Sequence, residues 1–538
     1  LMQIYTSAGW DQREAAQSIL KNNLYGLDID DRAAQLAYFA VMMKARQYDR
    51  RLFTRGIQPN IFSIRESNGI QAMTIEYFHK NDPKLKTDIE SIITEMRDAK
   101  EYGSILNITP VDFAGLYARF DEIRNDINMM QMSALDELLP LVKCAELLAQ
   151  KYDVVVTNPP YMGGSGMNAR LSQYVKDHFP DTKADLFACF IERGNQMTVK
   201  HGYNCMVTMQ SWMFLSSFEK MREKVLQTKS ITNLMHMENM VMGIAFGTAV
   251  TIFRNDHVTG YKGTYNQIKL QDIENGEPKT FPVPENRFAQ TSTDNFAKIP
   301  GSPVAYWLSL GAVLAFAHCE PLGVIAEIRQ GLATSNNDKY LRRWYEVETE
   351  QIDFHAKSTE SARDRGKRWF PFNKGGDYRK WYGNQEYIVD YENDGAEMKK
   401  DVLRKYPYLK TPDFVIKNTK YYFRSSITWT EISSSHFGVR YCPACSIFSN
   451  KSNSIFLQDE TTMFYLTGFL CSNVADLYIK AINPTITTNV GDVAKIPINI
   501  SAALFPECAQ NVRTNIDNSK LDWDSYETSW DFKRNPLV

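Results

Sequence analysis

Residues Asn158-Pro159-Pro160-Tyr161 combine groups that could hold and activate an aromatic amine. Such an amine is a poor nucleophile because its lone pair is delocalised into the ring. It attacks a sulfonium methyl group better when two acceptors hold its hydrogens and favour a pyramidal nitrogen. The Asn158 side-chain oxygen and the Pro159 carbonyl offer two acceptors, and the Tyr161 ring offers a face on which a base can stack. The tetrapeptide therefore indicates methyl transfer to an exocyclic amino nitrogen.

A short β-branched run over 154–157 comes directly before this tetrapeptide and is typical of a buried strand. Proline fixes φ and has no N–H, so two successive prolines must end the strand and turn the chain out of the sheet. In open α/β sheets, ligands bind at the carboxyl ends of the strands. The plainer alternative is a proline-terminated strand with a surface tyrosine, and the strand context disfavours it.

Asn158 to Tyr161 resembles motif IV of amino-methyltransferases that use S-adenosylmethionine, in the form typical of adenine-N6 DNA enzymes. The resemblance implies that Asn158, Pro159, Pro160 and Tyr161 are the catalytic residues. In relatives, an aromatic residue farther along the chain stacks on the other face of the extruded base. Phe246, before a β-rich run over 248–254, is the candidate here. A core phenylalanine beside a hairpin is an equally open interpretation.

A second motif lies near the start of the chain, where residues 24–30 read as a short strand followed by an alanine-rich helix. An acid at the end of such a strand accepts hydrogen bonds from ribose hydroxyls, and the next apolar side chain lies against the adenine. Asp28 and Ile29 resemble motif II of the same methyltransferases in these cofactor-binding roles. An acid at a strand-to-helix junction is more often a helix N-cap, and Asp30 or Asp31 suits that role.

The rest of the expected cofactor site is less complete. Residues 58–64 read as a third strand, after which Glu66 is expected near the adenine of S-adenosylmethionine. No glycine-rich turn precedes motif II. We therefore expect the first strand and its glycine loop to lie before Leu1, and this truncated chain to bind the cofactor weakly. Residues from about 82 to 149 read as a helical insertion, with apolar residues at helical spacing: Leu116, Phe120, Ile123 and Ile127.

Composition limits the other possibilities. The 538 residues predict two to four domains, and the 43% hydrophobic content is ordinary for globular cores. Eight cysteines without regular spacing predict reduced thiols and a cytoplasmic location. We identify no apolar run long enough to span a membrane and no signal peptide. The formal charge of −2 disfavours a nucleic-acid partner unless the basic residues are segregated.

Basic residues do concentrate after position 360. Those expected to bind DNA are Arg363, Arg365, Lys367, Arg368, Lys374, Arg379 and Lys380. Aromatic residues alternate with them: Trp369, Phe370, Phe372, Tyr378, Trp381 and Tyr382. Basic side chains neutralise phosphates, while aromatic rings can stack on an unpaired base. A run of charged residues is more often only a solvated surface. The presence of motif IV in the same chain favours DNA binding here.

Over most of its length the sequence is similar to the large adenine-specific methyltransferases of BREX phage-defence systems, the PglX type, and to the methylase parts of type IIG restriction enzymes. The resemblance implies an α/β protein. A Rossmann-like class I methyltransferase domain with the helical insertion would span 1–300, and a connecting helix 301–321. A C-terminal mixed α/β domain for DNA target recognition would span 322–538.

The implied function is site-specific adenine-N6 methylation of a flipped base in double-stranded host DNA, within restriction-modification or BREX defence. Other subunits of the defence system are further candidate partners. One alternative is a DNA-binding specificity module whose catalysis is vestigial or partner-dependent. Another is an RNA or protein-glutamine methyltransferase, since these also use Asn-Pro-Pro-Tyr.

Two weaker motifs are set aside. Cys442 and Cys445 form half of a zinc site without a second pair, so we predict no metal. Asp413 and Lys417 suggest a nuclease motif, but Val415 occupies the place of its second acid. We therefore predict no DNA cleavage by this chain.

Overall fold

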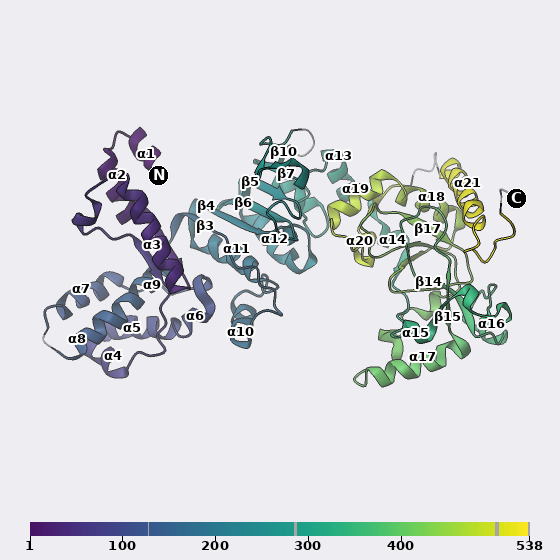
Figure 1. Ribbon diagram of the computed structural model, residues 1–538, viewed down its shortest axis with the longest axis horizontal. Coiled ribbons are helices and arrows are strands. Elements are labelled where there is room, and N and C mark those ends of the chain that lie inside the picture. Colours follow the sequence, from purple (N-terminus) through teal and green to yellow (C-terminus); the bar gives the residue numbers. More distant parts are fainter. Residues whose placement is uncertain (127, 285–287, 501–504, 536–538) are drawn as a thin grey trace. The chain divides into compact units, whose positions relative to one another are not determined.

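Helices and strands alternate along the chain in a computed structural model, which describes residues 1–126, 128–284, 288–500 and 505–535 (Figure 1). The protein is mixed α/β and divides into two units. Unit 1 contains residues 1–212 and 220–293, and unit 2 contains residues 213–219 and 294–538. Among the helices of the described residues, none is both long and apolar enough to cross a membrane.

Unit 1 begins with a parallel β-α-β arrangement. Helices α1 (Met2–Ser7) and α2 (Gln12–Ser18) precede strand β1 (Tyr25–Asp28), which runs parallel to β2 (Asn60–Ser63) and ends with Asp28 opposite Ser63. Helix α3 (Asp31–Arg46) connects the two strands. The Asp30 side chain caps α3 by accepting hydrogen bonds from two backbone amides at 2.7 and 3.1 Å, which confirms the predicted N-cap.

A group of helices follows β2. They are α4 (Ala72–His79), α5 (Pro83–Glu95), α6 (Ala99–Tyr102), α7 (Phe113–Ile123), α8 (Met130–Ser133) and α9 (Leu139–Ala149). The helices begin ten residues earlier than the sequence suggested. Phe78, Leu116, Phe120 and Leu141 are buried in one apolar cluster between them. The spacing in α7 therefore marks a core face, although Ile127 lies outside the described residues.

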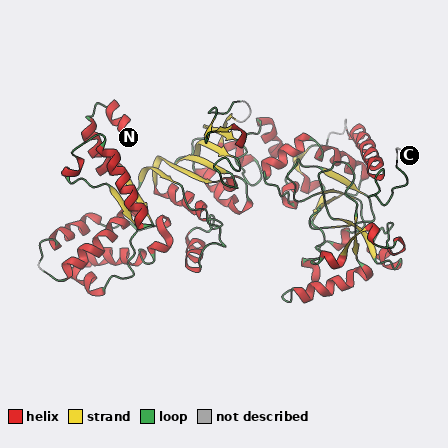
Figure 2. Ribbon diagram, viewed as in Figure 1, coloured by secondary structure: helices red, strands yellow, loops and turns green. Residues whose placement is uncertain are grey.

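A six-stranded sheet forms the second half of unit 1 (Figure 2). Its strands are β3 (Tyr152–Thr157), β4 (Thr198–Met209), β5 (Ser230–Met237), β6 (Thr248–Arg254), β7 (Lys262–Ile268) and β10 (Phe288–Ser292). The order is β10-β7-β5-β6-β4-β3, with β3 parallel to β4 and β6 antiparallel to both of its neighbours. Helices α10 (Ala169–His178) and α11 (Leu186–Met197) connect β3 to β4, and α12 (Glu219–Thr228) precedes β5. A short hairpin, β8 (Ile273–Glu274) and β9 (Glu277–Pro278), follows β7.

The predicted connecting helix over 301–321 is only partly formed, because residues 301–309 are loops and turns. The backbone amide of Val304 donates to the carbonyl of Met213 across 2.8 Å, which holds this segment in a non-helical conformation. Helix α13 (Leu310–His318) begins only after Ser309, whose side chain accepts a hydrogen bond from the amide of Ala312. The connecting helix is therefore shorter than 301–321.

Two small sheets build the rest of unit 2. One has the order β12 (Glu327–Arg329), β19 (Ser454–Phe456), β16 (Ser426–Trp429) and β17 (Val439–Cys442). The other has the order β13 (Leu341–Arg343), β15 (Tyr387–Asp390), β14 (Trp369–Asn373) and β18 (Ile447–Phe448). Strands β11 (Glu320–Pro321) and β20 (Pro497–Ile498) form a further pair.

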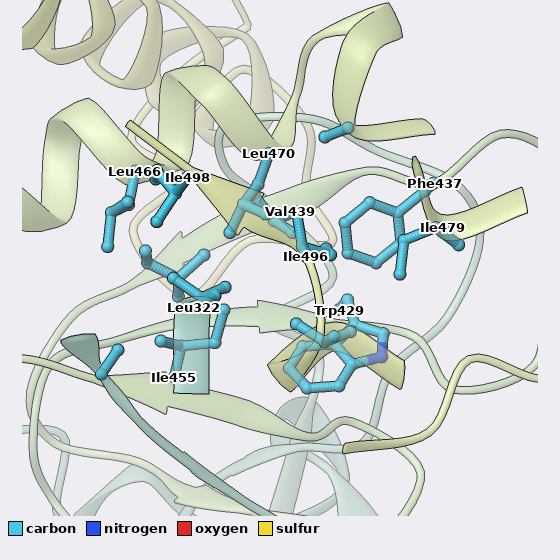
Figure 3. Packing of buried hydrophobic residues seen from close by; sticks show 14 of the residues in the cluster. Leu322, Trp429, Phe437, Val439, Ile455, Leu466, Leu470, Ile479, Ile496 and Ile498 are labelled. Carbon is cyan, nitrogen blue, oxygen red and sulfur yellow. The ribbon is translucent and has the colours of Figure 1, made fainter. Parts of the chain in front are cut away.

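Helices cover these sheets. They are α14 (Leu322–Ile325), α15 (Asn337–Tyr340), α16 (Thr359–Asp364), α17 (Glu392–Lys405), α18 (Glu460–Leu470), α19 (Asn473–Ile482), α20 (Val490–Ala494) and α21 (Phe505–Asp524). Figure 3 shows the main apolar cluster, in which Trp429 and Ile455 of the first sheet pack with Leu466 and Leu470 of α18.

Candidate active site

The Asn158–Tyr161 tetrapeptide lies at the carboxyl end of β3. Strand β3 pairs in parallel with β4, and its last residue, Thr157, is opposite Met206. Pro159 is buried and fixes the turn, while Asn158 is exposed. The local sequence thus ends the strand and leaves the Asn158 carboxamide at the edge of the sheet, where a ligand can reach it.

The Tyr161 side chain connects this turn to the neighbouring strand. Its hydroxyl lies 3.2 Å from Oδ1 of Asn158 and 3.2 Å from the carbonyl oxygen of Val207 in β4. Burial raises the pKa of this hydroxyl, so it stays protonated and can donate to either acceptor. The ring is enclosed edge-on by Phe187 at 6.1 Å and by Phe246 at 5.7 Å between ring centroids.

Phe246 lies near the tetrapeptide, and the residue after it, Gly247, passes close to the Gln210 side chain. A Cβ on Gly247 would lie 2.4 Å from the side-chain carbon Cδ of Gln210, so a larger residue here would displace the Gln210 side chain. Oε1 of Gln210 is 2.5 Å from Nε2 of His236. Burial lowers the pKa of His236 to about 4, so this imidazole is neutral at physiological pH.

Hydrogen bonds to Asp185 and Leu186 hold the start of the glycine-rich loop that follows the tetrapeptide. The amide of Met162 donates to Oδ1 of Asp185 across 3.0 Å, and the amide of Leu186 donates to the carbonyl of Met162 across 3.0 Å. Asp185 also caps α11. Burial raises the pKa of Asp185, although hydrogen bonds from three backbone amides oppose the shift.

The predicted cofactor residues lie at the carboxyl ends of β1 and β2. Asp28 is exposed, and its Oδ1 accepts a hydrogen bond from the amide of Asp30 at 2.9 Å. Because Asp30 is the N-cap, the Asp28 carboxylate is not used for capping. The Ile29 side chain is exposed beside it, and Glu66 is exposed after β2. This carboxylate beside an apolar side chain fits the ribose and adenine of S-adenosylmethionine.

Helix α6 links this group to the segment that follows the tetrapeptide. Nζ of Lys100 lies 3.4 Å from the carboxylate of Asp31, at the start of α3. The adjacent Glu101 accepts a hydrogen bond from Asn168, the N-cap of α10, across 2.6 Å. The two motifs are therefore joined through one helix, although no direct contact between their side chains is among the described interactions.

Strands β1 and β3 face each other across an open slot of about 160 Å³, lined by residues of both strands, including Leu27 and Val155. The rings of their first residues, Tyr25 and Tyr152, are in contact, with centroids 5.5 Å apart. In β3, Val154 is 54% exposed and Val156 is 71% exposed. Apolar side chains so exposed on an unpaired strand edge are typical of a position where another strand pairs.

The basic residues predicted to bind DNA lie in unit 2, around α16 and β14. Some already have partners: Arg365 pairs with Asp353 at 3.3 Å, Arg368 pairs with Asp390 at 2.8 Å, and Lys367 donates to the carbonyl of Glu350. Lys374 lies over the Tyr387 ring and Arg379 over the Trp523 ring, at 4.4 and 4.9 Å from the centroids. Arg363 and Lys380 are on the surface, and Arg363 is exposed.

The aromatic residues between them correct one expectation. Trp369, Phe370, Phe372 and Tyr382 are buried, so they are not available to stack on an unpaired base. Phe370 and Phe372 pack in one apolar cluster, and Trp369 packs in another. Strand β14 is covered on both faces, which explains its continuous run of large apolar residues.

Sequence reasoning missed Phe187, Asp185, Gln210 and His236. The one local signal was Asp185 at the start of a helix, which is typical of an N-cap. The role of the other three depends on contacts between β3, α11, β4 and β5.

The two cysteines of the half zinc motif lie in unit 2. All eight cysteines have free thiols, as predicted. Cys442 is buried with its Sγ 3.0 Å from Oγ of Ser446, and burial raises the pKa of Cys445 to about 12. Within the described residues, no three His, Cys, Asp or Glu side chains group as metal ligands.

Comparison with known proteins shows which sequences this chain resembles. Residues 22–241 match the family of Eco57I restriction-modification methylases. The whole chain is 36% identical to the adenine-specific methyltransferase BrxX of Escherichia coli O9:H4 (strain HS) and 33% identical to the adenine-specific methyltransferase PglX of Lacticaseibacillus casei (strain Zhang). By sequence, this chain is similar to the adenine-specific methyltransferases BrxX and PglX. It spans 45% of the length of each of these two relatives.

A solved structure supports the fold of this chain. The structure is that of the type IIL restriction-modification enzyme MmeI in complex with DNA. The alignment covers all of this chain and 70% of MmeI, with a TM-score of 0.54. The sequences are 10% identical, so this likeness concerns the fold alone. The predicted resemblance to BrxX and PglX is confirmed, and the mixed α/β fold is shared with a restriction-modification enzyme.

Proposed function

We propose that this chain contains the methyl-transfer centre of a site-specific DNA adenine-N6 methyltransferase. The observation that carries the proposal is the position of Asn158 and Tyr161 at the carboxyl end of β3, with Phe246 beside the tyrosine ring. Sequence similarity to adenine-specific methyltransferases supports adenine as the base.

The residues would act by holding the amine. Oδ1 of Asn158 and the carbonyl oxygen of Pro159 accept its two hydrogens, which favours a pyramidal nitrogen with an available lone pair. Pro160 keeps the turn rigid, and the Tyr161 ring stacks on the flipped base. S-adenosylmethionine, when bound, supplies the electrophilic methyl group. The amine nitrogen would form the new N–C bond as the bond between this methyl group and sulfur breaks, with the electron pair staying on sulfur, and the surplus proton of the amine would pass to water.

The ring geometry implies a movement when the base enters. A base between two parallel rings needs about 7 Å between them, which is twice a van der Waals contact. The rings of Tyr161 and Phe246 are 5.7 Å apart and inclined at 72°. We therefore expect the segment before Gly247 to move, so that the Phe246 ring turns to lie against the base. The backbone turns sharply there, with positive φ at Met240 and Gly243.

Asp28, Ile29 and Glu66 would form the adenosine side of the cofactor site. In the Rossmann order 3-2-1-4-5, the first strand lies between the second and the fourth. Strands β2 and β1 correspond to the third and second, and β3 and β4 to the fourth and fifth. The slot between β1 and β3 is then the position of the first strand and its glycine loop. A parallel strand there would cover Val154 and Val156.

Unit 2 would supply DNA recognition. Its surface arginine and lysine side chains, such as Arg363 and Arg379, suit phosphate contacts. The relative MmeI forms a complex with DNA, which supports double-stranded DNA as the substrate. The similarity to BrxX and PglX favours a place in BREX defence.

The direct test is methylation of duplex oligonucleotides by the full-length protein, with detection of N6-methyladenine by mass spectrometry. Transfer to adenine in duplex DNA is the expected result. Transfer to RNA or to glutamine in preference to duplex DNA would contradict the proposal.

A further inference from the structure

A cavity of about 380 Å³ opens in unit 2 between the β16–β17 hairpin, α19 and the segment that follows α19. This volume is within the range of pockets that bind small molecules. The cavity lies in unit 2, whereas the tetrapeptide lies in unit 1. Its lining includes Tyr378, the residue before the basic Arg379 and Lys380. The polar and charged residues that line the cavity include Thr430, Ser434, His436, Arg440, Asp476 and Lys480.

The walls of this cavity are connected by backbone hydrogen bonds. The amide of Ser433 in the hairpin donates to the carbonyl of Ile486 across 2.9 Å, and the amide of Thr488 donates to the carbonyl of Glu431 across 2.7 Å. Phe437, which also lines the cavity, belongs to the buried cluster of Figure 3. The cavity is therefore formed by well-connected elements of unit 2, and it has an apolar base and a polar wall.

Arg440 brings a positive charge to this wall without an acidic partner. Its side chain is 1% exposed, and its guanidinium donates to the Thr430 hydroxyl across 3.2 Å. In the part of the chain that the structure describes, no carboxylate forms an ion pair with Arg440, and its Nε has no hydrogen-bond partner. Burial lowers the pKa of Arg440 to about 10, which still leaves it charged at neutral pH.

The nearest acid of the cavity wall, Asp476, is already occupied. Its carboxylate accepts hydrogen bonds from the amide of Phe437 at 2.8 Å, from the ring of His436 at 2.9 Å and from Nζ of Lys480 at 2.7 Å. Although burial opposes the shift, these donors lower the pKa of Asp476. The Asp476 charge is balanced by Lys480, and the charge of Arg440 is left unbalanced.

We propose that this cavity binds a phosphate group and that Arg440 is its counter-charge. An unpaired buried cation is costly, and an anion that enters the cavity removes that cost. The planar fork of a guanidinium matches two phosphate oxygens. The remaining oxygens can accept hydrogen bonds from the serine hydroxyls of the hairpin, including that of Ser434. The phosphate belongs either to the DNA backbone or to a free phosphate ester.

The test is a calorimetric titration of the 538-residue chain with inorganic phosphate in a phosphate-free buffer at constant ionic strength. We expect saturable binding with a Kd of about 1 mM, an affinity typical of a single small anion. Arg440→Gln should abolish this binding. Because Arg440 is buried, a second variant at the exposed Ser434 is needed. Ser434→Asp should weaken binding by about tenfold or more through charge repulsion, whereas the matched Ser434→Asn should retain it within about twofold.

Competition identifies the source of the phosphate. If a duplex oligonucleotide displaces inorganic phosphate from the wild-type chain, the site holds a DNA backbone phosphate. If a 5′-mononucleotide displaces it and the duplex does not, the site holds a free phosphate ester. The absence of saturable phosphate binding, or equal binding by wild type, Arg440→Gln and Ser434→Asp, overturns the proposal. None of these measurements depends on methyl transfer.

Discussion

The hydroxyl of Tyr161 lies 3.2 Å from Oδ1 of Asn158. Tyr161 can therefore occupy the acceptor that the proposed reaction needs from Asn158. A substrate amine must replace this donor at Asn158. The same hydroxyl can instead donate to the carbonyl of Val207, also at 3.2 Å, so Asn158 can be released without leaving the tyrosine unpaired.

Replacements of Tyr161 separate its ring from its hydroxyl. Tyr161→Phe keeps the stacking face and frees Asn158, so kcat/KM for duplex DNA should stay within about threefold of wild type. Tyr161→Ala removes the stacking face, worth about 1–3 kcal/mol for a base, so kcat/KM should fall about 5- to 150-fold. Steady-state methylation measures both. Equal losses in the two variants would show that the hydroxyl, rather than the ring, carries the function.

His236 should make the stability of unit 1 sensitive to acid. Its pKa is about 4 in the folded protein and near the usual 6.5 when unfolded, so the unfolded chain takes up a proton first as the pH falls. Above pH 6.5, neutral His236 makes its full contribution to the free energy of unfolding. This contribution falls by about 3 kcal/mol as the pH is lowered from 6.5 to 4. Urea unfolding at pH 7 and pH 5 measures the free energy of unfolding at each pH. This free energy should fall less between pH 7 and pH 5 for His236→Gln than for wild type. The exposed His178 offers the control His178→Gln, which should behave like wild type.

Gly194 fixes the distance between α11 and β4. A Cβ at this position would lie 2.5 Å from Cε of Met206 and 2.7 Å from the buried Asn204 side chain. Gly194→Ala should therefore lower the free energy of unfolding by about 1–3 kcal/mol through overpacking. Gly69→Ala is the matched control, since nothing lies within 4 Å of its added Cβ. Equal stability of the two variants in urea unfolding would contradict this packing argument.

The parts of the site that the sequence could predict depend on local chemistry. Two prolines after a β-branched run end a strand wherever they occur, so the turn at Asn158 was predictable. The cap at Asp30 was predictable for the same reason, because its side chain and the nearby amides of Arg32 and Ala33 form it. Strand β6 spans the residues of the predicted β-rich run, 248–254.

The parts that could not be predicted depend on long-range packing. Phe187 and Phe246 meet Tyr161 only because α11 and the segment before β6 return to the end of β3. The aromatic residues of β14 resembled a base-stacking surface, but their burial depends on layers that cover both faces of the strand. A sequence shows the alternation of residue types, while the coverage of each face is a property of the whole fold.

The slot between β1 and β3 predicts how the chain binds its cofactor. Since no strand of the described residues occupies the slot, the 538-residue chain should bind S-adenosylmethionine weakly. A longer protein with a strand there should bind at least about tenfold more tightly, because backbone amides of a glycine loop would complete the site. Calorimetry measures both affinities, and hydrogen exchange should show slower exchange at Val154 and Val156 in the longer protein. The same affinity and exchange in both proteins would contradict the assignment of the slot.

The central claim is that Asn158 holds the amine of a flipped adenine during methyl transfer. Asn158 is exposed, so Asn158→Ala should leave the stability unchanged, and Asn125→Ala is a matched control at an exposed asparagine away from the tetrapeptide. The most direct measurement is the rate of N6-methyladenine formation in duplex DNA by the full-length protein, with DNA affinity measured on the same samples. The account predicts a loss of at least about 100-fold in rate for Asn158→Ala, with DNA affinity and the Asn125→Ala rate unchanged. Methylation by Asn158→Ala at the wild-type rate would contradict it.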